Sequence, residues 1–146
     1  MPCYLGANHR TMRNILLPGL LLGVILLATS YIFLYATVNL FPELAWEYFG
    51  PAFHTDGSRN ALFFIHPFLF GLAIAWLWTR IKGVFRGAPW LRGLEFGIIY
   101  TLVATLPAMW ITFSAIDISV AMVLTWLLYG AVQASLAGWV LARWRP

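Results

Sequence analysis

Long runs of apolar residues alternate with short polar stretches along this chain. A helix that crosses a bilayer needs about 20 consecutive, mostly apolar residues. Four runs meet this requirement: 15–40, 61–81, 93–113 and 120–142. The first run is the longest, so we expect its helix to tilt or to extend its Tyr31 to Asn39 end into the membrane interface. The pattern predicts an all-α membrane protein with a bundle of four transmembrane helices.

The polar stretches between these runs are short, which leaves room for a single transmembrane domain over residues 15–146. We expect residues 1–14 to form an N-terminal tail. Met12 is an alternative start, because the first helix follows it almost at once. The loop 41–60 is the longest connection, and the loop 82–92 between the second and third helices is rich in basic residues.

The first run admits a second interpretation as a cleaved signal peptide. Arg10 and Arg13 precede an apolar stretch that ends in Ala28 to Ser30, a small-x-small triplet of the kind found at cleavage sites. The apolar residues continue through Tyr35, however, which makes the run too long for a signal core. We therefore expect a retained transmembrane helix.

The composition of the chain supports the membrane assignment. Of its 146 residues, 62% are hydrophobic and 10% are charged, whereas an ordinary soluble domain carries about 25% charged residues. A soluble protein of this size buries too little surface to hide so many apolar side chains. The formal charge of +4 does not indicate nucleic-acid binding, because the basic residues flank apolar runs and form no basic face.

The single cysteine, Cys3, lies in the N-terminal tail. An intramolecular disulfide needs two cysteines, and a structural zinc or iron–sulfur site needs several Cys or His ligands at close spacing. We therefore expect no metal and no cofactor.

The basic residues are distributed unevenly between the two sides of the predicted bundle. Basic residues near helix ends are retained on the cytoplasmic side of a membrane. Arg59 falls on the side of the loop 41–60, together with most of the acidic residues. The other eight of the nine Lys and Arg residues fall on the opposite side: Arg10, Arg13, Arg80, Lys82, Arg86, Arg92, Arg143 and Arg145. The asymmetry predicts that both termini are cytoplasmic in a bacterial-type inner membrane.

Each predicted helix carries small residues at a spacing of four, which lets helix backbones approach closely in lipid. The residues concerned are Gly19, Gly23, Gly71, Ala75, Gly97, Thr101, Gly130, Ala134 and Gly138. The stripe on the fourth helix is the longest, and Gln133 lies beside it with an amide that gains from a partner. These stripes either pack the four helices into one bundle or, on the fourth helix, form a seam with a second protomer.

Short motifs that recur along the chain indicate an internal repeat. Gly-xxx-Gly motifs at 19–23 and 93–97 open the two helices that run outward, and the segments 76–80 and 139–143 close the two that run inward, each from Trp to Arg. One hairpin copied into two in parallel orientation would produce this pattern.

A histidine inside a membrane segment is costly to bury, so His66 is a candidate for function. Pro67 follows it, and Pro107 stands at about the same depth in the third helix. Two kinks at one level would open an outward-facing cavity, lined by His66, Asn39 and Thr105 with Asp117 or Glu43 nearby. The alternative is that a neutral His66 bonds to a carbonyl that the kink frees.

Two carboxylates at helix ends have structural interpretations. Glu95 lies near the start of the third helix, where it favours the helix dipole and can pair with Arg92 or Arg80. Asp117 is placed to cap the fourth helix together with Ser119.

Several stretches of the chain resemble small four-helix bacterial inner-membrane proteins of an uncharacterised family. The likeness is carried by the run from Arg13 to Gly19, the helix with His66 and Pro67, and the stretch from Gly93 through Gly130. It covers most of the chain from Met12. The resemblance implies a location and a topology, and it transfers no catalytic residue.

No nucleophile with a neighbouring base, no phosphate-binding glycine loop and no pair of intramembrane acids stands out in the sequence. We therefore favour a non-enzymatic structural or accessory component of a membrane complex or of a homo-oligomer. The alternative is a small proton-linked transporter or channel protomer that uses the His66 level as its polar step.

Overall fold

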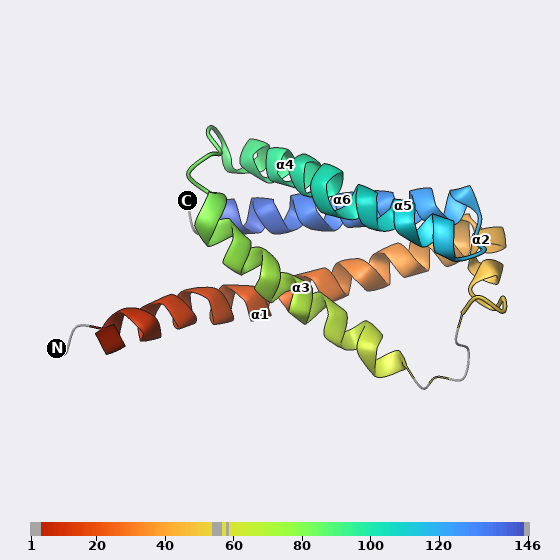
Figure 1. The fold of residues 1–146 in the computed structure, drawn as a ribbon, viewed down its shortest axis with the longest axis horizontal. Coiled ribbons are helices and arrows are strands. Elements are labelled where there is room, and N and C mark those ends of the chain that lie inside the picture. Colours follow the sequence, from red (N-terminus) through yellow and green to blue (C-terminus); the bar gives the residue numbers. More distant parts are fainter. Residues whose placement is uncertain (1–3, 54–56, 58, 145–146) are drawn as a thin grey trace.

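The computed structural model describes residues 4–53, 57 and 59–144, with side chains from residue 15 onward. The regular secondary structure of this part is entirely helical (Figure 1). Its elements are α1 (Tyr4–Leu40), α2 (Pro42–Glu47), α3 (Asn60–Ile81), α4 (Pro89–Tyr100), the π-helix η1 (Thr101–Thr105), α5 (Leu106–Ala115) and α6 (Val120–Trp144).

The prediction of four long apolar helices is confirmed. Stretches long and apolar enough to cross a membrane are Ile15–Leu40, Asn60–Ile81, Pro89–Ala115 and Val120–Trp144, which suggests a multi-pass membrane protein. The third helix begins earlier than the predicted residue 93. Pro89 suits the first turn of a helix, because its missing N–H would have no partner there.

The four long helices form two pairs. In the first pair, α1 and α3 cross where their backbones meet at glycines (Figure 1). A methyl group added to Gly71 would lie 2.5 Å from the Gly19 carbonyl oxygen and 2.8 Å from the Gly23 nitrogen. Only glycine therefore fits at this crossing, and close backbone contacts at glycine are typical of membrane helices.

In the second pair, α4, η1 and α5 run beside α6. A methyl group added to Gly93 would lie 2.6 Å from the Trp139 Cα, and one added to Gly97 would lie 2.7 Å from the Ser135 Cα. Gly138 on α6 packs back against Gly93. Glycines thus set the contact in this pair as well.

The two pairs meet in a buried core near the loop between α3 and α4. Three aromatic rings form its centre: Trp78 stacks on Phe85 with centroids 5.5 Å apart, and Phe96 meets both rings edge-on. Leu22 from α1 and Leu141 from α6 complete the cluster, and both are at most 1% exposed. The core therefore lies in one half of the bundle.

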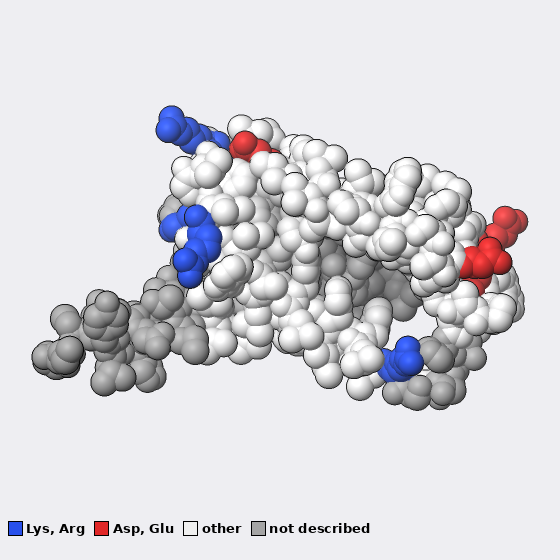
Figure 2. Space-filling model, viewed as in Figure 1, with Lys and Arg blue, Asp and Glu red and all other residues white. Residues whose placement is uncertain are grey.

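Charged side chains gather at the two ends of the bundle (Figure 2). The acidic side chains of Glu43 and Glu47 lie on α2, at the same end as Asp117 in the turn between α5 and α6. The opposite end carries Glu95 and the basic residues Arg80, Lys82, Arg86, Arg92 and Arg143. The core thus sits in the half that ends in the basic side chains.

The π-helix η1 follows from a proline. Pro107 has no N–H to donate, so the turn before it cannot close with regular α-helical bonds. The Leu106 N–H instead bonds to the Thr101 carbonyl, five residues earlier. A π-turn of this kind is common at functional sites, and here it sets the position of Thr105.

Candidate functional site

A network of uncharged polar side chains joins α1 to α6 within the bundle of long apolar helices. The Gln133 amide nitrogen donates to the Tyr129 hydroxyl at 2.7 Å, and it lies 3.2 Å from the Ser30 hydroxyl. The Ser30 and Tyr129 hydroxyls are 2.6 Å apart. Gln133 is 2% exposed and Ser30 is 4% exposed, so the network is shielded from its surroundings.

The donors of this network can be assigned one after another. The Ser30 O–H donates to the Leu26 carbonyl at 2.8 Å, so the Tyr129 O–H is the donor toward Ser30. The two Gln133 N–H groups then serve three acceptors, the Tyr129 and Ser30 hydroxyl oxygens and the Leu26 carbonyl, so that one N–H is shared between two of them. Every donor is used, and the Gln133 amide oxygen remains as an acceptor.

Beside the network lies a cavity of about 350 Å³, which we call the His66 cavity. Figure 2 shows a hollow between α3 and α5 on this face of the molecule. The cavity is lined by His66, Phe70, Tyr100, Ala104, Thr105, Ala108, Met109, Trp126, Tyr129, Gly130 and Gln133. It therefore opens between the two helix pairs, in the half of the bundle away from the aromatic core.

Several polar side chains of the His66 cavity have no hydrogen-bond partner in the described part of the chain. They are His66, Tyr100 and Thr105, and the Gln133 amide oxygen adds a fourth polar group. The His66 ring stacks on Phe70, with centroids 6.0 Å apart and an interplanar angle of 6°. Aromatic rings and a few convergent polar groups are typical of small-molecule sites.

A second cavity, of about 250 Å³, shares Trp126 and Tyr129 with the first. Its other lining residues are Ser30, Phe33, Leu34, Thr37, Tyr48 and Phe63. The Trp126 and Tyr129 rings therefore separate two hollows, and the polar network touches both.

The predicted polar residues fall in different places. His66 and Thr105 line the same cavity, as the positions of Pro67 and Pro107 suggested. Asn39, Glu43 and Asp117, although described, lie outside its lining. The Asn39 amide donates to the Tyr35 carbonyl of its own helix at 2.7 Å. Glu43 and Asp117 line two surface hollows near α2.

The cap of α6 differs from the expected one. Ser119 accepts a hydrogen bond from the Met122 N–H at 3.1 Å, as predicted for a capping serine. The carboxylate that reaches this turn is Glu47 of α2, which accepts from the Ser119 N–H at 3.2 Å. Asp117 has no hydrogen bond with a described residue.

Tyr48 ties the segment after α2 to α6. Its hydroxyl accepts a hydrogen bond from the Trp126 indole at 2.6 Å. Burial raises the pKa of the Tyr48 phenol, the Trp126 hydrogen bond opposes the rise, and the Glu47 carboxylate adds to it. The phenol therefore stays protonated at neutral pH.

The predicted pairing of Glu95 with Arg92 or Arg80 is wrong for the described residues. The Arg80 guanidinium lies 5.6 Å from the centre of the Trp76 ring, and that of Arg92 lies 5.4 Å from the Trp78 ring. Both cations use an aromatic face, which attracts a positive charge through its π electrons.

The small residues of the predicted packing stripes are used inside the chain. Gly130 faces the Thr105 side chain, while Ala134 is completely buried. On α3, Ala75 is 2% exposed. The Thr101 hydroxyl donates to the Gly97 carbonyl at 2.7 Å, which satisfies it within its own helix. The α6 stripe thus faces α4 and η1, and Gln133 finds its partners on α1 and α6.

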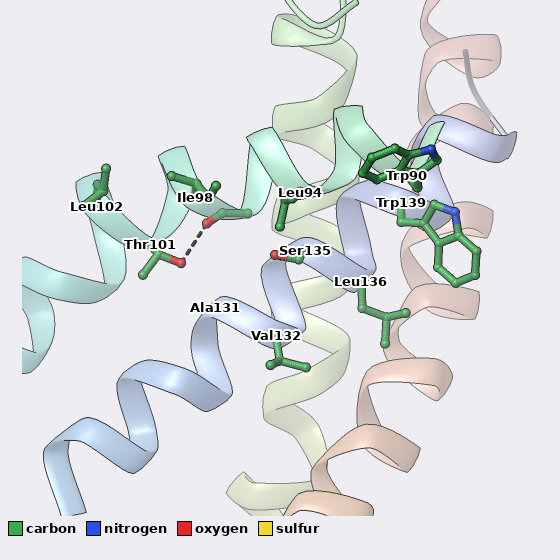
Figure 3. A pocket seen from close by; sticks show the side chains of 11 residues that line it. Trp90, Leu94, Ile98, Thr101, Leu102, Ala131, Val132, Ser135, Leu136 and Trp139 are labelled. Atoms are coloured by element: carbon green, nitrogen blue, oxygen red, sulfur yellow. Dashed lines mark hydrogen bonds between the residues drawn. The ribbon is translucent and has the colours of Figure 1, made fainter. Parts of the chain in front are cut away.

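A groove on the surface of the second pair lies between α4, η1 and α6 (Figure 3). We call it the α4–α6 groove; its volume is about 680 Å³. It is lined by Trp90, Leu94, Gly97, Ile98, Thr101, Leu102, Ala131, Val132, Ser135, Leu136 and Trp139. The two tryptophans lie near each other at one end of the groove.

Neither Tyr129 nor the α4–α6 groove was among the sites predicted from the sequence. A signal for Tyr129 was present, because it lies one helical turn before Gln133 and therefore on the same face. The groove had no local signal, since it arises from two helices lying side by side.

Comparisons with protein-family models, with curated proteins and with solved structures returned no match. The resemblance to an uncharacterised family therefore stays a prediction. Among the described residues, no group of three or more His, Cys, Asp or Glu side chains is placed to hold a metal ion.

Proposed function

We propose that this chain is a non-enzymatic accessory protein of a bacterial-type inner membrane, which binds a small, uncharged amphipathic molecule in the His66 cavity. Both termini lie in the cytoplasm in this proposal. The gathering of basic side chains at one end of the bundle supports that orientation.

The observation that carries the proposal is the set of unpaired polar groups in a cavity with aromatic walls. His66, Thr105 and the Gln133 amide oxygen have no hydrogen-bond partner among the described residues. Where no bulk water reaches a membrane-spanning segment, a hydrogen-bond partner stabilises a polar group by roughly several kcal/mol. A ligand with its own polar head supplies that partner.

The lining of the cavity narrows the chemistry of the ligand. No Asp, Glu, Lys or Arg is among the lining residues, so a charged head would lose its hydration without compensation. The Gln133 oxygen accepts hydrogen bonds, which favours a head with a hydroxyl or an amide N–H. The Phe70 and Trp126 rings favour an apolar body.

The experiment is to purify the protein from native membranes in a mild detergent and to identify bound small molecules by mass spectrometry. Ala108 lines the cavity, so Ala108→Phe fills it and should abolish the bound molecule. Ile111 is 65% exposed on the same helix and lies outside the lining, so Ile111→Phe should retain it.

Absence of any bound molecule from the wild-type protein would contradict the proposal. Equal retention in Ala108→Phe and Ile111→Phe would contradict it too, because the ligand would then lie elsewhere. Circular dichroism of both variants checks that the helices remain folded.

Proton-linked transport is a second candidate function, and the position of His66 favours it. The imidazole lines the cavity, is exposed and makes no hydrogen bond in the described part of the chain. In liposomes that contain a pH-sensitive dye, His66→Leu should then abolish proton flux and preserve the fold. Equal flux in wild type and His66→Leu would exclude this candidate.

A further inference from the structure

The α4–α6 groove is a hollow of the surface that the His66 cavity does not include. The small residues Gly97, Ala131 and Ser135 are among its lining residues. The groove runs along the two helices and ends at Trp90 and Trp139 (Figure 3). Its shape and apolar lining fit a single flexible hydrocarbon chain.

The end marked by the tryptophans is also the basic end of the bundle. Trp90 is the second residue of α4, directly after the basic loop, and Trp139 lies near the end of α6. Arg143 follows Trp139 by four residues and therefore lies on the same helix face, one turn closer to the end. The groove thus leads from an apolar trough, past two indoles, to a guanidinium.

The Arg143 guanidinium is available for a ligand. Arg80 and Arg92 at the same end stack on tryptophan rings. Arg143, by contrast, is exposed and makes no ion pair or ring contact with any residue that the structure describes. A guanidinium binds phosphate through two parallel hydrogen bonds.

We infer that the α4–α6 groove binds one anionic phospholipid. One acyl chain lies along the groove, the ester region meets the Trp90 and Trp139 indoles, and the phosphate meets Arg143. The indoles suit the ester region because tryptophan prefers the boundary between hydrocarbon and headgroups.

The headgroup of the phospholipid, and not its acyl chain, determines which lipid the groove prefers. Acyl chains are as apolar as the residues of the groove, so the groove alone has no preference among lipids. A basic side chain near an anionic headgroup adds about 1 kcal/mol, or roughly a fivefold preference. A transmembrane helix would offer Arg143 no negative charge, and a second copy of this chain would bring a basic end of its own. Neither complements the guanidinium as an anionic headgroup does.

The test is native mass spectrometry of the purified protein with equal amounts of phosphatidylglycerol and phosphatidylcholine that carry identical acyl chains. We expect the wild type to retain phosphatidylglycerol preferentially, and Arg143→Gln to lower that preference about fivefold. Arg59→Gln removes the same charge at the opposite end and should leave the preference unchanged.

A second pair of variants tests the groove. Val132 lines the groove and is 42% exposed, so Val132→Phe should fill it and weaken retention of both lipids. Val103 is 73% exposed and lies outside the lining, so Val103→Phe should have no effect.

Equal retention of the two lipids by the wild type would overturn the inference. An effect of Arg59→Gln as large as that of Arg143→Gln would also overturn it, because net charge would then explain the preference. So would unchanged retention in Val132→Phe, or a wild-type dimer that Val132→Phe separates, which would make a second copy the occupant. All four variants change exposed side chains, and circular dichroism checks their folding.

Discussion

The two helix pairs begin from the same kind of contact and end in different shapes. In each pair, a Gly-xxx-Gly motif brings two backbones together, at 19–23 on α1 and at 93–97 on α4. In the second pair, α4, η1 and α5 all stay beside α6. In contrast, α3 leaves α1 beyond the crossing (Figure 1).

Side chains beyond the glycines explain the difference. In the second pair, small residues continue toward the outer end, where Gly130 faces Thr105. In the first pair, aromatic rings follow: Tyr31 lies 6.3 Å from Phe63 and 6.2 Å from Phe64, measured between ring centroids. A glycine motif sets where two helices cross, and the residues beyond it decide whether they stay together. The pair that diverges leaves space for the His66 cavity.

The largest effect should come from the crossing glycines. Gly71→Ala and Gly93→Ala each place a methyl group against a neighbouring backbone, so the helices must move apart. We expect each to lower the free energy of unfolding by about 2 kcal/mol, measured by unfolding in mixed detergent micelles. If only one of the two destabilises the protein, the two pairs are not held together by the same kind of glycine contact.

Gly83→Ala is the matched control for these variants. A methyl group there meets nothing within 4 Å, and the residue lies in the loop after α3. We expect its unfolding free energy to equal that of the wild type.

The helices and the small-residue faces by which they pack could be predicted from sequence because both depend on local patterns. Apolar runs fix the spans, and small residues at a spacing of four mark the faces that touch. The two prolines at similar depth also led to the prediction that His66 and Thr105 share a cavity, and both residues line the His66 cavity.

The rest of the site could not be predicted because it depends on how helices diverge. Counting residues from the membrane surface placed Asn39 and Asp117 near His66, which assumes straight, parallel helices. α3 departs from α1, so equal depth no longer means proximity. The bond between Ser30 and Tyr129 joins residues 99 positions apart, and no local pattern reports such a pairing.

The next largest effect should come from the network that joins the two pairs. Gln133→Leu removes the donor to Tyr129, Ser30 and the Leu26 carbonyl. Interhelical hydrogen bonds in membranes contribute about 1 kcal/mol, and we expect a loss of that size in the same unfolding measurement.

Thr125→Val serves as the control for Gln133→Leu. Its hydroxyl donates to the Ala121 carbonyl within the same helix, at 2.8 Å, so no contact between helices is lost. A loss in Thr125→Val equal to that in Gln133→Leu would mean that the network does not join the pairs.

A smaller effect is expected at Tyr48, which lies outside the four long apolar helices. Tyr48→Phe removes the acceptor for the Trp126 indole and should cost about 0.5 to 1 kcal/mol at neutral pH. Burial raises the pKa of the folded-state phenol above its ordinary value of 10.0. The stabilisation is therefore complete below pH 10 and is lost as the pH rises through the raised pKa.

The difference between wild type and Tyr48→Phe should shrink in unfolding measurements above pH 10, because only the wild type has this phenol to ionise when unfolded. A difference that is constant up to pH 11 would contradict the assigned burial of the hydroxyl. Tyr35→Phe is a suitable control, since that side chain is 73% exposed.

The smallest change in stability, and the most direct test of the comparison, concerns the rings between α1 and α3. Tyr31 and Phe64 are both partly exposed, so replacing both by Ala should alter the unfolding free energy by less than about 0.5 kcal/mol. The distance between the outer ends of α1 and α3 should nevertheless become shorter. Spin labels at Val38 and Leu62, which are exposed near those ends, report the distance by pulsed electron paramagnetic resonance.

Ile32→Ala with Leu69→Ala is the control for this double variant, because these side chains are 70% and 62% exposed on the same two helices. If the aromatic rings hold the helices apart, the distance shortens in the first double variant and stays unchanged in the second. An unchanged distance in both would mean that the rings fill a space that something else creates. The divergence would then originate at Pro67, where α3 lacks one backbone hydrogen bond, and not in the side chains beyond the glycines.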